Sequence, residues 1–432
     1  MSKVRSWRNA LRFMHGNILV LTVTGVLGML GRAMAFPYAS LFILSLGGEP
    51  AQIGLVNSLA PLAGLVMFPL GGYLADHSGR VKLIGLAGYL SGAIYLLYIF
   101  APNWQVIALA GLLQGFMVVQ FPPSSAIIAD SLAPEDRGRG IATMNTIAGA
   151  LAVFCPYLAG SVLDALGANV GMRYLYGFLM VVYMASAAIN LRFLSETLPP
   201  SRGKLRLPDV PTMLRTAYGG IPEMLRRLPR SFRALAAVVI LGFMANGIAG
   251  PFWVIYAVQQ IGLSSAQWGL ILLVETALRN VMYTPAGVMV DRHGRTKFML
   301  ASLLLCLVSM PLFVFSATFA QVLLIRALVA ISNAFFIPAC AALMADIVPR
   351  EIRGRVMAAI GRGTVMIGAA SGGTGGPGLG FLMTIPLMIA SLSGGYLYTL
   401  SPAYPWFFVT IATAIALILS AMFVRDPRKA EV

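Results

Sequence analysis

Long apolar runs separated by short polar stretches make up most of the chain. Many runs reach about 20 residues, the length a helix needs to cross a hydrocarbon core of about 30 Å. Because backbone polar groups cannot stay unsatisfied in lipid, each run is predicted to be a helix. Twelve spans are expected, at 18–46, 52–75, 83–101, 104–129, 140–165, 173–194, 234–261, 266–289, 298–317, 320–344, about 379–400 and 404–424.

A polar stretch divides these spans six and six. It predicts an N-terminal six-helix bundle at 1–194, a cytoplasmic linker at 195–233 and a C-terminal bundle at 234–432. The linker mixes Pro and Arg with apolar residues, so it is either a plain tether or contains a short helix on the membrane surface. A glycine-rich insertion at about 366–380 precedes the eleventh span, within an inner extension expected at roughly 356–380. This insertion is either a disordered linker or a hinge.

Composition excludes a soluble domain. The chain is 58% hydrophobic and only 11% charged, with mean hydropathy +0.82, whereas soluble domains carry roughly 25% charged residues. A β-barrel would show short alternating segments instead of continuous apolar runs. The three cysteines fall in apolar runs without paired spacing, and the three histidines form no metal motif. The sequence therefore predicts an all-α integral membrane protein without metal, cofactor or catalytic constellation. It also contains no nucleotide-binding glycine loop of the kind that a primary pump needs.

Lysine and arginine in the short loops set the orientation, because they favour the cytoplasmic side. The odd-to-even connections contain a single basic residue, Arg173. The other connections are rich in Lys and Arg, namely Arg80, Lys82, Arg137, Arg139, Arg292, Arg295, Lys297, Arg350, Arg353 and Arg355. Both termini and the linker share this basic side, so we expect both ends in the cytoplasm and a multi-pass protein of the inner (plasma) membrane. The net charge of +16 is scattered over loops, which argues against nucleic-acid binding.

Three sequence motifs occur twice, at offsets of 214 to 216 residues. The pairs are LGMLGRAMAFP (27–37) with LGFMANGIAGP (241–251), GGYLADHSGRVK (71–82) with AGVMVDRHGRTK (286–297), and ADSLAPEDRGR (129–139) with ADIVPREIRGR (345–355). The two halves are therefore predicted to be copies of one six-helix unit. Since six is even, both copies enter from the same side, and such parallel repeats place a substrate site near the midplane between the halves.

At the second of these pairs the chain resembles the major facilitator superfamily. The first copy of the signature keeps Gly72, Leu74, Ala75, Asp76, Gly79 and Arg80, with His77 where a basic residue is common. The second copy keeps Gly287, Asp291, Arg292, Gly294 and Arg295. The resemblance covers the whole chain. It implies twelve transmembrane helices in two pseudo-symmetric six-helix halves and transport by alternating access.

The signature loop must reverse the chain in about six residues at headgroup level. Gly79 and Gly294 are expected to take the left-handed backbone geometry of such a turn. Arg80 and Arg295 are expected to meet lipid phosphates or a neighbouring carboxylate. A tight turn anchored by charges would suffice to explain the motif.

The resemblance implies a further role for this loop as a cytoplasmic latch. Asp76 would lie near the start of the eleventh helix and Arg80 would point to Asp130, and together they would lock the outward-open state. The second copy offers Asp291, Arg295 and Asp346.

Four ionisable residues lie deep in predicted spans: Arg32, Glu275, Arg279 and Arg326. Such residues usually mark a transport pathway or a paired structure. Glu275 is the one deep carboxylate of fifteen, so it is the candidate for proton coupling. Alternatively, Glu275 forms a static pair with Arg279, which follows four residues later on the same helical face.

The predicted spans thus contain three deep arginines and a single deep carboxylate. Arg32 and Arg326 are therefore expected either to offer sites for an anionic group or to contact backbone carbonyls. Asn246, at the place of Arg32 in the second half, and Gln114 complete the candidates for the central cavity, together with Arg279. Gln114 belongs to GLLQG (111–115), which resembles a drug–proton antiporter pattern but has Gly111 at its arginine position.

The sequence thus predicts a monomeric secondary transporter of small molecules, closest to the drug/proton antiporter branch of the family it resembles. By that resemblance it would export amphipathic compounds in exchange for protons. Proton-linked uptake or facilitated transport of an organic anion is the alternative that Arg32 and Arg326 suggest. A non-transporting membrane receptor is the third possibility.

Overall fold

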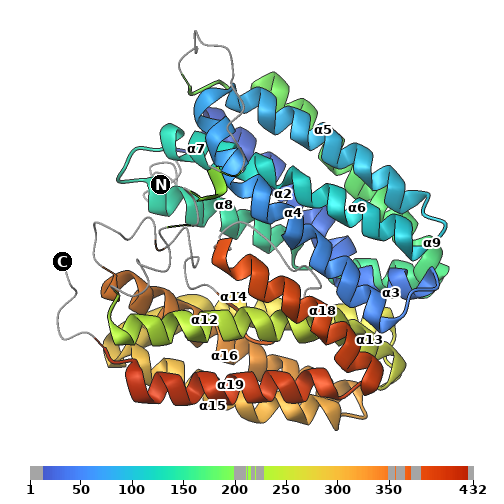
Figure 1. The fold of residues 1–432 in the computed structure, drawn as a ribbon, viewed down its shortest axis with the longest axis vertical. Coiled ribbons are helices and arrows are strands. Elements are labelled where there is room, and N and C mark those ends of the chain that lie inside the picture. The colour runs from blue at the N-terminus through green and yellow to red at the C-terminus, as the bar shows by residue number, and fades with distance from the viewer. Residues whose placement is uncertain are drawn as a thin grey trace, which may run out of the picture.

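The structure is a computed structural model that describes residues 13–198, 211, 213–215, 219, 228–348, 356, 365–370 and 381–426. Within these residues every regular element is a helix (Figure 1), which agrees with the all-α prediction. Most of the predicted linker at 195–233 lies outside the described residues.

The helices from α2 to α9 gather in one half of the molecule, called the N-half here (Figure 1). Their bounds are α2 (Gly16–Ala35), η1 (Phe36–Tyr38), α3 (Ala39–Ser45), α4 (Pro50–His77), α5 (Arg80–Ile99), α6 (Trp104–Phe116), η2 (Met117–Gln120), α7 (Phe121–Ser131), α8 (Arg137–Ala152) and α9 (Cys155–Phe193).

The helices from α12 onward form the other half, called the C-half (Figure 1). Their bounds are α12 (Arg230–Ala249), η3 (Gly250–Phe252), α13 (Trp253–Gln259), α14 (Ser265–His293), α15 (Arg295–Val314), α16 (Phe319–Ile347), η4 (Phe381–Met383), α18 (Thr384–Leu400) and α19 (Tyr404–Phe423).

Nine continuous helical stretches of the described chain are long and apolar enough to cross a membrane. One of them, Arg137–Phe193, contains two of the predicted spans, because the chain reverses at Gly167, where φ is 77°. The other two predicted spans correspond to α14, which is made more polar by Glu275 and Arg279, and to α18, which has 17 residues. Each of the twelve predicted spans therefore has a helical counterpart.

The first helix of each half is interrupted in the same way. A three-residue 3₁₀ turn contains Pro37 in the N-half and Pro251 in the C-half. Proline cannot donate the backbone hydrogen bond that would continue the α-helix, so the pitch tightens there. The shared break is the structural form of the sequence repeat.

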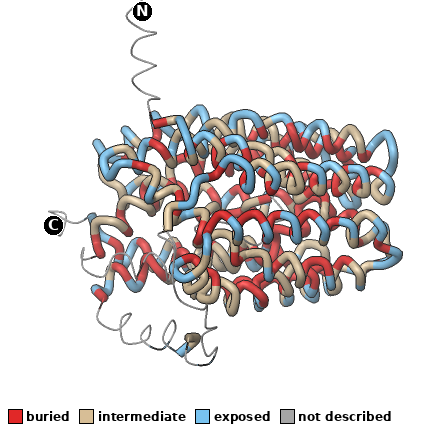
Figure 2. Tube along the Cα trace, turned by 90° about the horizontal axis from the view of Figure 1, so that it is seen from above, coloured by how far each residue is buried: buried red, intermediate tan, exposed pale blue. Residues whose placement is uncertain are grey.

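Many large apolar side chains of the bundle are exposed, and buried and exposed positions alternate along its helices (Figure 2). Phe100, Val281 and Leu400 are about three-quarters exposed, at 74%, 75% and 75%. A water-soluble protein does not leave many large apolar side chains open to solvent. This surface suits a hydrocarbon environment.

The two ends of the bundle are named here by their loops. The basic side is where α4 ends and α5 begins, at Arg80. The opposite side is where α3 ends and α4 begins, at Pro50.

The halves meet along two helix pairs, α4 with α18 and α9 with α14. Glycines allow this close approach, as small residues do between membrane helices. Any Cβ at Gly160 of α9 would overlap the Ser265 carbonyl of α14, and any Cβ at Gly269 of α14 would overlap the Pro156 carbonyl of α9. The contacts lie toward the opposite side, which is therefore closed.

Polar groups reinforce this closure where α14 begins. The Asp164 carboxylate of α9 accepts hydrogen bonds from the backbone N–H groups of Ser265 (2.8 Å) and Ala266 (2.9 Å). A carboxylate at a helix N-terminus is stabilised by the free N–H groups and the helix dipole. The Tyr38 hydroxyl donates to the Pro156 carbonyl at 2.7 Å and lies 3.0 Å from the Ser265 carbonyl. The N-half thus forms hydrogen bonds with the backbone of the first turn of α14.

Substitution of Gly160 by valine is expected to open the opposite side, because the added methyl groups cannot fit against Ser265. Spin labels on Phe100→Cys and Phe315→Cys, at the exposed ends of α5 and α15, report the separation of the halves. The three native cysteines are buried, so the labels react at the introduced sites. The distance should lengthen in Gly160→Val and stay unchanged in Gly177→Val, since nothing lies within 4 Å of a Cβ at Gly177. Equal distances in both variants would contradict the packing argument.

Candidate functional site

A cavity of about 280 Å³ lies within the N-half. Its walls come from α2, η1, α3, α4, α5, α6, η2, α7 and α9, and Thr384 at the start of α18 is the contribution of the C-half. The side chains include Arg32 and Gln114, and the other large or polar members are Phe36, Asn57, Phe68, Tyr95, Tyr98, Gln120, Phe121, Tyr176 and Tyr183. The cavity is thus mainly apolar and aromatic with a few polar groups, as small-molecule sites usually are.

Arg32 lies near the middle of the 30-residue run Gly16–Ser45. Its Nη1 donates to the Tyr183 hydroxyl at 3.2 Å, and its guanidinium folds back over Gly28, where a Cβ would lie 3.1 Å away from Nη1. No carboxylate of the described residues forms an ion pair with Arg32. A charge at this depth costs roughly 2.5–3.5 kcal/mol on insertion scales, and a tyrosine hydroxyl leaves it unneutralised.

Tyrosine rings pack together beside Arg32. The ring centroids of Tyr95 and Tyr183 are 5.3 Å apart, and those of Tyr98 and Tyr176 are 4.5 Å apart. Gln114 also belongs to this wall, and its Nε2 donates to the Ser91 carbonyl at 2.9 Å. The side-chain amide therefore ties α6 to α5 at the cavity wall.

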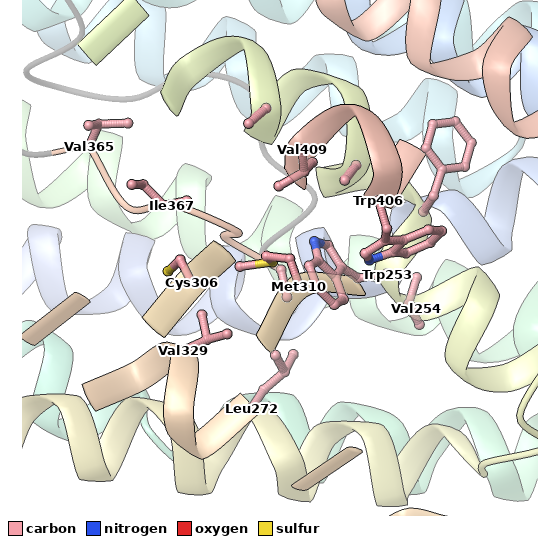
Figure 3. Packing of buried hydrophobic residues seen from close by; sticks show 14 of the residues in the cluster. Trp253, Val254, Leu272, Cys306, Met310, Val329, Val365, Ile367, Trp406 and Val409 are labelled. Carbon is pink, nitrogen blue, oxygen red and sulfur yellow. The ribbon is translucent and has the colours of Figure 1, made fainter. Parts of the chain in front are cut away.

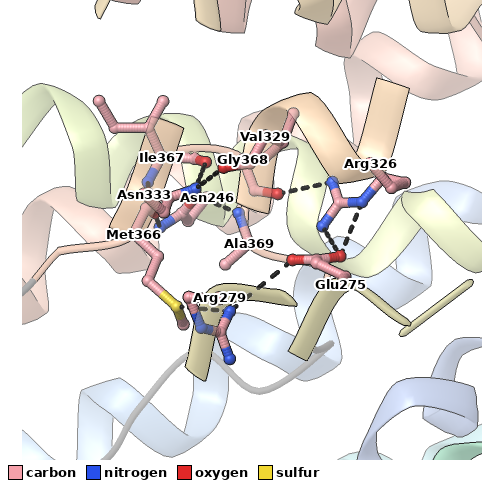
Figure 4. Close-up of polar contacts among 10 residues, drawn as sticks. All are labelled: Asn246, Glu275, Arg279, Arg326, Val329, Asn333, Met366, Ile367, Gly368 and Ala369. Carbon is pink, nitrogen blue, oxygen red and sulfur yellow. Dashed lines mark hydrogen bonds and ion pairs between the residues drawn. The ribbon is translucent and has the colours of Figure 1, made fainter. Parts of the chain in front are cut away.

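The C-half holds a different arrangement of charge, shown in Figure 4. Glu275 of α14 accepts from Arg326 of α16 through Nε at 2.9 Å and Nη2 at 2.5 Å. Both side chains are buried, with Arg326 fully so and Glu275 6% exposed. The Arg326 guanidinium carbon lies 4.4 Å from the Trp253 ring centroid. Arg279 approaches the second carboxylate oxygen at 3.8 Å, the i,i+4 contact that the spacing predicts.

These contacts place three of the predicted cavity residues elsewhere. Arg326, Arg279 and Asn246 do not line the N-half cavity but surround a short segment of the C-half. The pairing of Arg326 with Glu275 was not foreseen, because the residues lie 51 positions apart on different helices.

The short segment, Val365–Ala370, is extended or turned chain inside the C-half, and polar side chains hold its backbone (Figure 4). Asn333 of α16 donates to the Ile367 carbonyl at 2.9 Å and accepts from the Ile367 N–H at 2.8 Å. Asn246 donates to the Met366 carbonyl and accepts from the Ala369 N–H. Arg326 donates to the Gly368 carbonyl at 2.8 Å. Non-helical backbone at membrane depth is tolerated when protein groups satisfy it in this way.

The apolar side chains of this segment belong to the C-half core. Val365 and Ile367 are 1% and 3% exposed, and they lie among Cys306, Val329 and Met310 in Figure 3. Gly368 has φ 72°, and a Cβ there would overlap the Met310 methyl group. The expected inner extension is therefore wrong for residues 365–370, because these residues are held inside the helix bundle. Residues 371–380 of the predicted insertion lie outside the described residues.

Sequence reasoning missed Asn333, although a signal was present. A single Asn in the middle of an apolar helix must find a hydrogen-bond partner, and α16 contains one such residue in ISNAFF. Asn246 carries the same signal in α12. The glycine-rich stretch that begins at Gly368 pointed instead to a disordered linker or a hinge.

On the basic side, Arg80 makes the contact that was expected of it. Its Nη1 lies 2.5 Å from Asp130 of α7, its Nε donates to the Ala75 carbonyl at 2.9 Å, and Nη1 also donates to Thr197 at 2.9 Å. Arg80 is 8% exposed. Asp76 is exposed, and Gly72 is half-buried with nothing within 4 Å of a Cβ. The ion pair therefore links α5 to α7 inside the N-half.

The second copy repeats this pattern in the C-half. Arg295 forms ion pairs with Asp346 of α16 and, at 3.3 Å, with Asp291. Acidic residues that follow the last helix of each half cap the helix after the motif. Glu196 accepts from the Val81 N–H at 3.1 Å, and Asp426 accepts from the Thr296 N–H at 3.1 Å. These two caps were not predicted.

The two motif glycines differ in backbone geometry. Gly294 has φ 103° and takes the expected left-handed region. Gly79 has φ −58°, so the expectation is wrong there. A side chain at Gly79 would instead approach the Glu196 carboxylate, 3.4 Å from its Cβ.

Comparison with known protein families identifies the chain. The model of the Major Facilitator Superfamily matches residues 21–243 and 235–432, which together include both copies of the motif. The chain belongs to the major facilitator superfamily.

Relatives within the superfamily are distant but cover most of the chain. An uncharacterized MFS-type transporter of Methanocaldococcus jannaschii is 23% identical over 94% of this chain and 95% of its own length. The multidrug resistance protein MdtG of Enterobacter lignolyticus is 26% identical over 75% of this chain and 76% of its own. The fold is similar to that of a bacterial homologue of the human lysosomal transporter Spinster, in an inward-facing and occupied conformation. That comparison has a TM-score of 0.68 at 15% identity and covers 95% of this chain and 98% of the other.

No group of three metal-ligating side chains occurs among the described residues of this superfamily member.

Substitution of Asn333 by alanine is expected to destabilise the C-half. The change leaves the buried N–H and C=O of Ile367 without their partners, at a cost of about 1–3 kcal/mol per unsatisfied group. Thermal unfolding in detergent should show a clear fall in Tm relative to wild type. Asn280→Ala is the matched control, since Asn280 is exposed on α14. Equal Tm values for the two variants would argue against a stabilising role for the hydrogen bonds between Asn333 and the Ile367 backbone.

Alanine at the two motif glycines should separate their roles. Gly294→Ala forces a Cβ into left-handed geometry and should cost about 1–2 kcal/mol. Gly79→Ala keeps an allowed φ and should cost much less. Unfolding measurements on the two variants test this order, and a larger loss at Gly79 would refute the assigned backbone geometries.

Proposed function

We propose that the protein is a secondary active transporter that exports amphipathic small molecules in exchange for protons. The observation that supports this most directly is the aromatic cavity beside two halves whose described helices pack together toward the opposite side. Such a structure suits a carrier in which the halves rock around a central site. The basic side is assigned to the cytoplasm by its Lys and Arg, so the state described here is closed outward.

The substrate class rests on similarity and on the cavity walls. A relative named as a multidrug resistance protein matches three-quarters of the chain. Aromatic rings around the cavity provide large apolar contact area, and Arg32, Asn57 and Gln114 provide polar contacts. Amphipathic compounds combine both needs.

Glu275 is the proposed proton-coupling residue. In this state its carboxyl group lies 2.5 Å from Nη2 of Arg326 and 3.8 Å from Nη1 of Arg279. Protonation would remove the charge that holds Arg326 in place. Glu275 lies on α14 six residues after Gly269, the glycine that packs against α9. A change at Glu275 can therefore be transmitted along one helix to the closed interface.

The basic-side ion pairs are proposed as the cytoplasmic gate. Arg80–Asp130 and Arg295–Asp346 each brace one half, so that each half can move as a unit. Asp76 is exposed here and would dock against the eleventh helix when the basic side closes. The protein is proposed to work as a monomer, with both termini cytoplasmic.

Proteoliposomes with an imposed pH gradient test the coupling. Movement of cationic, neutral and anionic amphipaths is followed for wild type, for Glu275→Gln and for the control Glu135→Gln, which changes an exposed loop carboxylate. Gradient-driven transport is expected to fall at least tenfold in Glu275→Gln and to persist in Glu135→Gln, because only Glu275 lies in the membrane core.

Two results would contradict the proposal. Gradient-driven transport that is unchanged in Glu275→Gln would remove this residue as the proton carrier. Absence of movement for every probe in the wild type would favour a receptor, and movement down a gradient without proton dependence would favour facilitated transport.

A further inference from the structure

Of the three arginines deep in the membrane, only Arg32 lacks a carboxylate among the described residues. Arg326 and Arg279 share Glu275. Arg32 meets the neutral hydroxyl of Tyr183. Glu275 therefore compensates one of the two positive charges in the C-half, while no described carboxylate compensates the charge of Arg32 in the N-half.

This uncompensated charge lines an open space. Arg32 belongs to the wall of the cavity of about 280 Å³, while Arg326 is fully buried against Trp253 and Glu275. A guanidinium in a low-dielectric cavity attracts an anion much more strongly than it would in water. It also offers planar, paired donors that match a carboxylate or sulfonate.

The sequence repeat explains why the N-half is the open one. At the repeat offsets Arg32 corresponds to Asn246, and Tyr95 corresponds to Met310. In the C-half both counterparts contact Val365–Ala370. Asn246 forms hydrogen bonds with Met366 and Ala369, and the Met310 side chain lies next to Gly368. The space equivalent to the N-half cavity is thus filled by the chain's own backbone. A ligand of the C-half would have to displace this segment, and a ligand of the N-half would not.

Aromatic rings define the rest of the ligand. Tyr95, Tyr98, Tyr176 and Tyr183 stand on the α5 and α9 side of the cavity, with Phe36 from η1. Ring-to-ring contacts with centroids 4.5 to 7 Å apart are favourable for a further aromatic group. A flat aromatic body with one anionic group therefore fits the lining.

We propose that the N-half cavity binds an aromatic or similarly flat amphipathic monoanion, a carboxylate or sulfonate, with Arg32 as its counter-ion. This inference rests on the proposed function for the statement that the ligand is transported, but binding itself can be measured without transport.

Binding of two matched probes to the full-length protein in lipid nanodiscs tests the proposal. Naphthalene-2-carboxylate and naphthalene-2-carboxamide share the ring system and differ in charge. The wild type should bind the carboxylate at least tenfold more tightly, which corresponds to about 1.4 kcal/mol. Arg32→Gln should abolish this preference, and Arg32→Lys should retain part of it because the charge remains.

Arg173→Gln serves as the control for loss of a positive charge, since Arg173 lies outside the cavity and caps the end of α5 through the Ala101 carbonyl. Its preference for the carboxylate should equal that of wild type. Equal affinities for the two probes in wild type would overturn the proposal, as would a preserved preference in Arg32→Gln.

The result is separable from that of the transport assay. Selective carboxylate binding by a protein that moves no solute would support this site and contradict the proposed function. Proton-driven export of cationic probes together with equal binding of the two naphthalenes would do the reverse.

Discussion

The ion pair between Glu275 and Arg326 is the interaction on which the C-half depends. It joins α14 to α16 in the membrane core, where an unpaired charge would be strongly unfavourable. The same guanidinium stacks on Trp253 and donates to the Gly368 carbonyl. Three separate parts of the chain are thereby fixed around one carboxylate. Because α14 also packs against α9 through Gly269, the interface between the halves and the buried charge lie on the same rigid helix.

The two halves have the same topology, but their interiors differ. Both have a proline-containing break in the first helix and an arginine–aspartate pair at the basic side. The interiors differ, because the C-half pairs Arg326 with Glu275 and holds Val365–Ala370, while the N-half has a cavity beside Arg32. A carrier built this way would present its ligand to one half and would use the other half mainly for coupling and closure.

The sequence predicted the parts of this structure that depend on local pattern. Apolar runs located the spans. The family resemblance implied the contact of Arg80 with Asp130, and the repeat extended it to Arg295. The i,i+4 spacing predicted the approach of Arg279 to Glu275. Contacts between distant helices were not predictable in this way, so the partner of Arg326 and the grip of Asp164 on α14 were missed. The position of Val365–Ala370 was predicted wrongly, since the glycine-rich stretch that begins at Gly368 suggests flexibility, while the partners of the segment, Asn246 and Asn333, lie far away in sequence.

The two equivalent pockets are expected to differ, with ligand in the N-half and the chain's own segment in the C-half. A cryo-electron microscopy structure of the wild-type protein with bound naphthalene-2-carboxylate tests it most directly. We expect ligand density beside Arg32 and the tyrosines, with Val365–Ala370 still held by Asn246, Asn333 and Arg326. Ligand density beside Arg326, with that segment displaced, would contradict it.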